Sequence, residues 1–87
     1  MNLQELKDFR SKLKYAKFLC ALHGYNTYIT FAFSDAGLIG QCADAFVCFI
    51  PPDVYNWYLD PTRTLTERKA MFDNSIAAID VRIAKTK

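Results

Sequence analysis

The amino-acid sequence predicts a two-layer α+β domain, in which an antiparallel hairpin or three-stranded meander packs against an N-terminal and a C-terminal helix. Apolar residues recur every three or four positions near both ends of the chain, which is typical of helices. Between them, aromatic and β-branched residues alternate, which is typical of strands. With 87 residues and 52% hydrophobic composition, we expect one domain spanning residues 1–87.

The first predicted helix covers residues 3–22. Its buried face is marked by apolar residues at steps of three and four, namely Leu6, Phe9, Leu13, Ala16 and Cys20. The second half, from Tyr15 to Leu22, is apolar on nearly every side, so we expect it to be buried on several sides or to contact a partner. Gly24 suits the end of this helix.

The middle of the chain predicts strands. Residues 25–33 alternate in the manner of a strand, and Ser34-Asp35-Ala36-Gly37 reads as a hairpin turn. Residues 38–42 are then the return strand, and residues 46–50 are a second apolar run. Whether residues 38–50 form one strand or two stays open, because thirteen residues exceed the usual strand length of about 5–6.

Two further helices follow Pro51-Pro52. Residues 53–59 predict a short helix that ends before Asp60-Pro61. Thr64 and Glu67 have the spacing of a capping box, which predicts the start of the long C-terminal helix. Its expected apolar face comprises Leu65, Phe72, Ile76, Ile79 and Ile83.

Catalytic chemistry finds little support in the sequence. The chain contains no phosphate-binding glycine loop, no dinucleotide fingerprint and no nucleophile elbow, and His23 is the only histidine. We therefore expect neither an enzyme nor a bound cofactor.

A metal site can be drawn only from Cys20, His23, Cys42 and Cys48. An extended strand would hold Cys42 and Cys48 roughly 20 Å apart, whereas zinc requires all its ligands at about 2–2.3 Å. The sequence does not decide whether these four residues come together in the fold. We expect the thiols to be reduced and no metal to bind. An odd number of cysteines without an export signal predicts a cytoplasmic location.

Charge is distributed unevenly along the chain. Residues 25–60 carry four aspartates and no lysine or arginine, whereas the segments on either side are basic, and the total is +2. The acidic segment also holds most of the aromatic residues. Exposed Tyr and Trp beside Asp are typical of protein interfaces.

The sequence therefore favours a small non-enzymatic binding domain, an inhibitor or adaptor that occludes another protein. A phage-type inhibitor of a nucleic-acid enzyme is one concrete form. The partner would present a basic or apolar pocket. The expected contact residues are Tyr28, Asp53, Tyr55, Trp57, Tyr58 and Asp60.

Two alternatives accompany this hypothesis. The basic residues Lys7, Arg10, Lys14 and Lys17 follow one edge of the first helix and predict nucleic-acid binding through phosphate contacts. The apolar half of the same helix predicts a homodimer. We expect no membrane partner, because the chain lacks a run of about 20 apolar residues.

Overall fold

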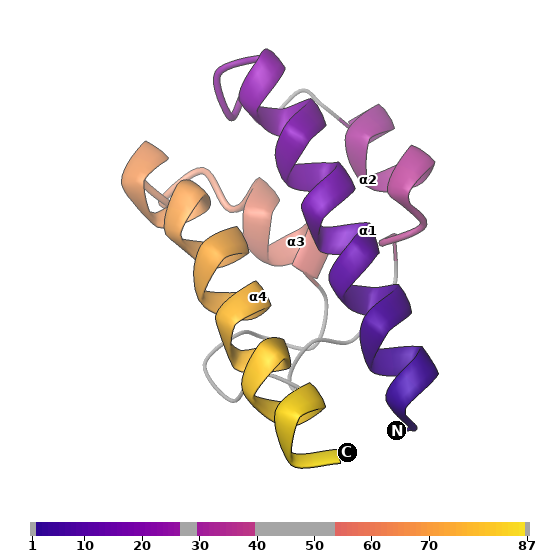
Figure 1. The fold of residues 1–87 in the computed structure, drawn as a ribbon. Helices are drawn as coiled ribbons and strands as arrows, with labels where there is room; N and C mark the ends of the chain where they lie inside the picture. The colour runs from indigo at the N-terminus through magenta and orange to yellow at the C-terminus, as the bar shows by residue number, and fades with distance from the viewer. Residues whose placement is uncertain (1, 27–29, 40–53, 87) are drawn as a thin grey trace.

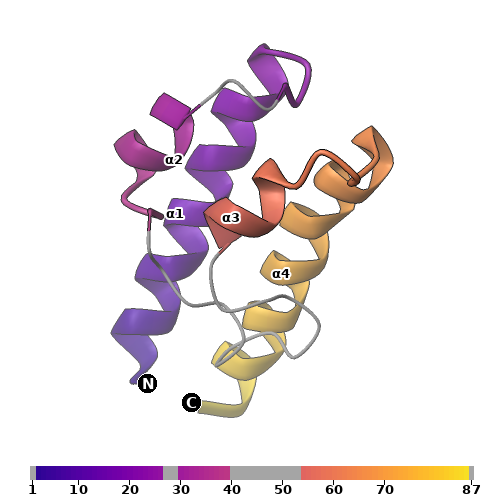
Figure 2. The same ribbon diagram turned by 180° about the vertical axis from the view of Figure 1, so that it is seen from behind.

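The computed structural model describes residues 2–26, 30–39 and 54–86, which form four helices and no strand. They are α1 (Leu3–Leu22), α2 (Thr30–Ala36), α3 (Val54–Leu59) and α4 (Leu65–Thr86). The long helices α1 and α4 lie side by side and run antiparallel, with α2 beside α1 (Figure 1). The view from behind shows α3 in front of the α1–α4 pair (Figure 2).

The predicted first helix is confirmed at both ends. At its start, Asn2 Oδ1 accepts a hydrogen bond of 2.8 Å from the Glu5 N–H. At its end, Gly24 has a φ of +66°, and its N–H donates to the Ala21 carbonyl. The Tyr25 N–H donates to the Cys20 carbonyl at 2.8 Å. This pair of bonds is a Schellman motif, which satisfies carbonyls that the helix end would otherwise leave unpaired.

The predicted α+β fold is wrong. Helices hold 81% of the described residues, and Thr30 to Phe33, expected in a strand, form the start of α2. The expected return strand is also absent at Leu38 and Ile39, while residues 40–42 and 46–50 lie outside the described part of the chain. The alternation of aromatic residues was outweighed by packing, because a helix buries Ala32, Phe33 and Ala36 together.

Gly37 accounts for much of this error. Its φ is +74°, the left-handed conformation expected of a hairpin glycine, but here it ends α2. The Gly37 N–H donates to the Ser34 carbonyl and the Leu38 N–H to the Phe33 carbonyl, which is a second Schellman motif. The same backbone requirement thus serves a helix end instead of a turn between strands.

The short and long C-terminal helices are confirmed where the structure describes them. α3 covers residues 54–59 of the predicted 53–59, and Asp53 lies outside the described residues. α4 begins with the predicted capping box: Thr64 Oγ1 accepts from the Glu67 N–H, and Glu67 Oε1 accepts from the Thr64 N–H. Of the expected apolar face, Leu65 is an exception because it is 47% exposed.

An aromatic cluster forms the centre of the core. The ring of Phe33 lies 4.9 Å from that of Tyr58 and 6.2 Å from that of Phe72. The Tyr25 ring packs at a tilt against Phe72, and the Tyr55 ring meets Phe33 edge-on. The cluster therefore joins α2, α3 and α4 to the buried face of α1, which comprises Leu6, Phe9, Leu13, Ala16 and Cys20.

Candidate functional site

The aromatic contact residues expected from the sequence lie mostly inside the fold. Tyr58 is fully buried, and its hydroxyl donates to the Asn26 carbonyl at 3.2 Å. Tyr55 is partly buried, and its hydroxyl lies 3.0 Å from the Thr30 hydroxyl. Tyr28 and Asp53 lie outside the described residues. Tyr58 is therefore a core residue in this structure, with no surface to offer a partner.

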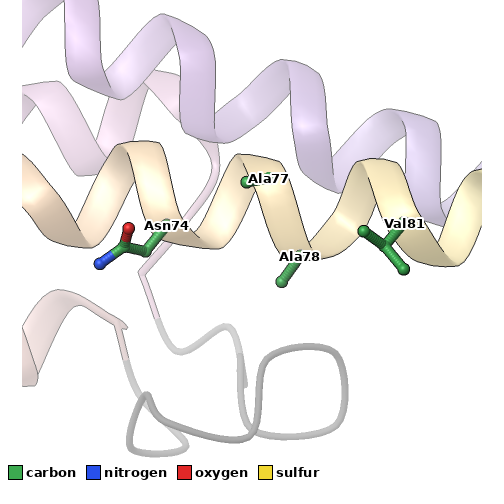
Figure 3. Close-up of a pocket in the computed structure, with 4 residues that line it drawn as sticks. All are labelled: Asn74, Ala77, Ala78 and Val81. Atoms are coloured by element: carbon green, nitrogen blue, oxygen red, sulfur yellow. The ribbon is translucent and has the colours of Figure 1, made fainter.

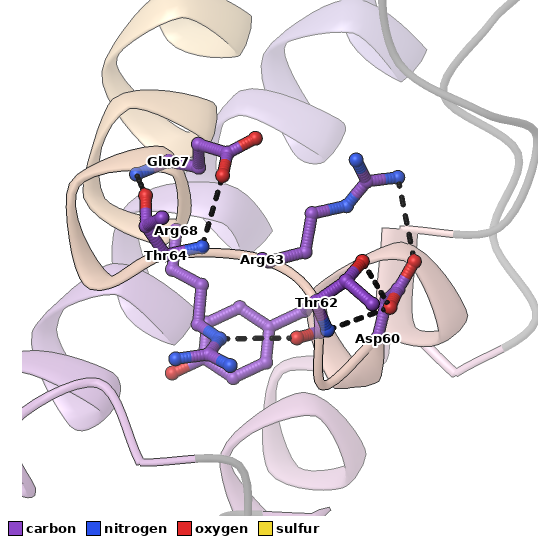
Figure 4. A network of polar contacts seen from close by, with 7 residues as sticks. Asp60, Thr62, Arg63, Thr64, Glu67 and Arg68 are labelled. Atoms are coloured by element: carbon purple, nitrogen blue, oxygen red, sulfur yellow. Dashed lines mark hydrogen bonds and ion pairs between the residues drawn. The ribbon is translucent and has the colours of Figure 1, made fainter.

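Asp60 belongs to a local network of polar contacts between α3 and α4 (Figure 4), and Trp57 contacts Arg63, which is also part of that network. The Arg63 guanidinium lies over the Trp57 ring, 4.3 Å from its centroid. Asp60 accepts hydrogen bonds from the Thr62 N–H at 2.9 Å and the Thr62 hydroxyl at 2.7 Å. These two bonds lower the pKa of Asp60. Both residues thus have intramolecular partners that hold the α3–α4 connection in place.

The basic residues of α1 are divided between two environments. Arg10 Nε lies 2.5 Å from Asp80 Oδ1, and Lys17 forms an ion pair with Asp73. Hydrogen bonding to Asp73 is the main cause of the raised pKa of Lys17. Lys7 and Lys14 are exposed on the outer side of α1. Two of the four residues expected to bind nucleic acid therefore connect α1 to α4.

Among the described helices, α1 has the largest number of exposed large apolar residues, and they lie on its outer face. Tyr15 is 47% exposed, Phe18 59% and Leu22 64%. Their spacing of three and four residues places all three on one side of the helix. We call these three residues the α1 stripe.

The α1 stripe lies nearly opposite the buried face of the helix. At about 100° of rotation per residue, Tyr15, Phe18 and Leu22 point away from the direction shared by Leu13, Ala16 and Cys20. Lys14 adjoins the stripe, one turn before Phe18. At the other end, the ring of Phe31, which is 43% exposed, meets the ring of His23 edge-on at 5.1 Å.

The sequence indicated the apolar character of this surface but not which side of the helix is exposed. The apolar character of residues 15–22 indicated either burial on several sides or a partner. The three-and-four spacing of the α1 stripe was the signal that could have located the exposed side. The choice of which side is covered depends on where α2 and α4 pack.

A hollow of about 340 Å³ lies along α4, lined among the described residues by Asn74, Ala77, Ala78 and Val81 (Figure 3). It contains no titratable side chain from the described residues. The hollow therefore offers no catalytic or metal-binding group there.

Cys20 and His23 do not form a metal site in the described part of the chain. Cys20 is buried, which raises its thiol pKa to about 11, whereas His23 is exposed. Cys42 and Cys48 lie outside the described residues, and the described residues contain no group of three ligands suitable for a metal ion. A thiol with a raised pKa is a poor nucleophile.

No protein-family model, characterised protein or solved structure matches this chain. Among the described helices, none combines the length and apolar character needed to cross a bilayer.

Proposed function

We propose that this protein is a small non-enzymatic protein-binding domain whose contact surface is the outer face of α1. The observation that supports this most strongly is the exposure of Tyr15, Phe18 and Leu22 on one side of one helix. Contiguous exposed apolar residues on a small domain mark interaction sites. Action as an adaptor or as an inhibitor that occludes a partner belongs to the same proposal.

The proposal moves the expected surface from α3 to α1. Tyr58 is buried and Trp57 lies beneath Arg63, so a partner would have to displace intramolecular contacts to reach them. A partner that contacts the α1 stripe displaces only water. That difference in cost favours α1 as the contact surface.

Nucleic-acid binding is the competing function. Arg10 and Lys17 are paired with acidic residues of α4, which leaves Lys7 and Lys14 as the members of the predicted basic set on the outer face. Each phosphate contact contributes about one unit to the slope of log affinity against log salt. Two contacts would give weak binding that disappears at physiological salt.

Affinity capture from the protein's native cells tests the proposal. We expect the wild-type protein to retain a partner, Phe18→Glu to lose it, and Leu65→Glu to retain it, since Leu65 is also a large exposed apolar residue but lies on α4. Trp57→Ala tests the alternative contact surface on α3 that the sequence predicted. Loss of the partner with folded Trp57→Ala, but not with Phe18→Glu, would move the site back to α3.

A titration with fluorescent DNA and RNA completes the test. We expect no binding at physiological salt. Salt-dependent binding that is lost in Lys7→Glu/Lys14→Glu, together with no protein captured, would replace the proposed function with the nucleic-acid alternative.

A further inference from the structure

We propose that the α1 stripe binds a second copy of this chain, with the two α1 helices antiparallel about a two-fold axis beside Phe18. This inference rests on the proposed function, because it takes the stripe to be a contact surface and names its occupant. Three features carry it: the spacing of the stripe, the charges beside it and its area.

The spacing makes the stripe self-complementary. Phe18 lies near the midpoint between Tyr15 and Leu22, and the three residues span about 10 Å along the helix. An antiparallel copy places Tyr15 against the partner's Leu22, Leu22 against the partner's Tyr15, and the two Phe18 rings together. A two-fold arrangement uses the same patch on both copies and closes the assembly at two chains.

The charges favour the antiparallel direction. In that arrangement Lys14 lies beside the last turn of the partner's α1, where the backbone carbonyls form the negative end of the helix dipole. The last turn of α1 contains no basic residue of its own. A parallel arrangement would instead bring the two Lys14 side chains together. Of the other cations along that edge, Arg10 and Lys17 are compensated by Asp80 and Asp73, and Lys7 lies two helical turns further from the axis than Lys14.

The area indicates a reversible dimer. The exposed fractions of Tyr15, Phe18 and Leu22 correspond to on the order of 300 Å² of apolar surface per copy, since large side chains bury roughly 150–250 Å². Two copies would therefore bury about 600 Å² of apolar surface, and the surrounding polar rim would have to supply the rest of the roughly 1,000 Å² that specific interfaces need. Interfaces below about 1,200 Å² are typical of weak, transient complexes, so we expect reversible association at protein concentrations of about 10 µM to 1 mM.

Sedimentation equilibrium of the intact protein, from about 10 µM to 1 mM, measures this association. We expect wild-type protein to shift from one to two copies of the 10.0 kDa chain. Phe18→Glu should weaken association by at least about 100-fold, because it brings two carboxylates to the axis. Leu65→Glu, which replaces an apolar residue on α4 that is 47% exposed, should leave association unchanged.

A pair of charge reversals tests the direction. Lys14→Glu should weaken association about tenfold, because it sets a negative charge beside the negative end of the partner's helix. Lys7→Glu makes the same change in net charge two helical turns further from the axis, so it should have little effect. Equal effects of the two variants would overturn the antiparallel arrangement.

If the wild-type protein stays monomeric throughout the concentration range, the proposal that the α1 stripe binds a second copy is wrong. The proposed function would then depend on the capture experiment alone. Loss of a heterologous partner in Phe18→Glu would support that function and assign the stripe to another protein. Absence of both self-association and capture would overturn both proposals.

Discussion

The Tyr58 hydroxyl is buried among aromatic rings, and its position explains why a tyrosine stands in the core. It donates to the Asn26 carbonyl in the segment that follows α1, and burial raises the pKa of Tyr58 strongly, so the hydroxyl stays protonated. A phenylalanine would fill the same volume but leave the carbonyl without this donor.

We therefore expect Tyr58→Phe to lower the free energy of unfolding by about 1–2 kcal/mol. The matched control is Tyr55→Phe, whose hydroxyl contacts the exposed Thr30 and can be replaced by water, so its cost should be below about 0.5 kcal/mol. Urea unfolding of both variants measures the difference. Equal losses would contradict a specific role for the buried hydroxyl.

Gly37 offers a test of backbone strain with little interference from packing. A Cβ at this position would lie 3.7 Å from the Lys12 Cε, an ordinary contact, but φ is +74°. Gly37→Ala should therefore destabilise the fold by about 1 kcal/mol through the backbone alone. A D-alanine introduced at the same position by chemical synthesis should not destabilise it. Loss of stability with both stereoisomers would point to a steric cause instead.

At the level of elements, the capping box sets the start of α4. Thr64 and Glu67 each accept a hydrogen bond from the other's backbone N–H. Thr64→Ala removes one of these acceptors, and we expect it to cost about 1 kcal/mol in thermal or urea unfolding. Thr66 lies two residues after Thr64 and makes neither of these bonds, so Thr66→Ala is the control and should change stability little.

The same motif predicts a dependence on pH. Hydrogen bonds from Thr64 lower the pKa of Glu67 from its usual value of 4.5, so the carboxylate contributes stability above that pH. This contribution should disappear as the pH falls through the folded-state pKa. Wild-type stability should therefore decline more steeply in acid than that of Glu67→Gln. Parallel curves for the two proteins would show that Glu67 is not linked to folding.

The ion pairs between α1 and α4 share one register. Arg10 and Lys17 are two turns apart, as are their partners Asp80 and Asp73 on the antiparallel helix. Because the pairs are partly exposed, a double-mutant cycle for Arg10→Ala and Asp80→Ala should give a coupling energy of only about 0.2–1 kcal/mol. The coupling should fall in 1 M salt. A salt-independent coupling would indicate packing of the side chains instead of charge.

For the whole molecule, self-association through α1 would link stability to concentration. Ligands that bind only the folded state raise its apparent stability, and a second copy is such a ligand. The melting temperature of the wild-type protein should therefore rise with concentration, whereas that of Phe18→Glu should stay constant. Identical behaviour of the two proteins in calorimetry would contradict the dimer.

Local sequence signals predicted the helices that carry their own start and stop residues. Gly24, Thr64 and Glu67 each act on backbone groups within a few residues, so their effect can be read without knowledge of the fold. The hairpin was predicted wrongly because the evidence for it was not unique. Gly37 suits a turn or a helix end, and only the burial of Phe33 against its neighbours selects the helix.

The sequence by itself determined where α1 and α4 begin, where α1 ends, and which residues of α1 turn toward the core. The tertiary structure decided which aromatic residues are buried and which are exposed: Tyr58 lies in the core and Phe18 on the surface. The reason is geometric. The second half of α1 is apolar on nearly every side, but α2 and α4 cover only part of it, so the α1 stripe is left facing solvent.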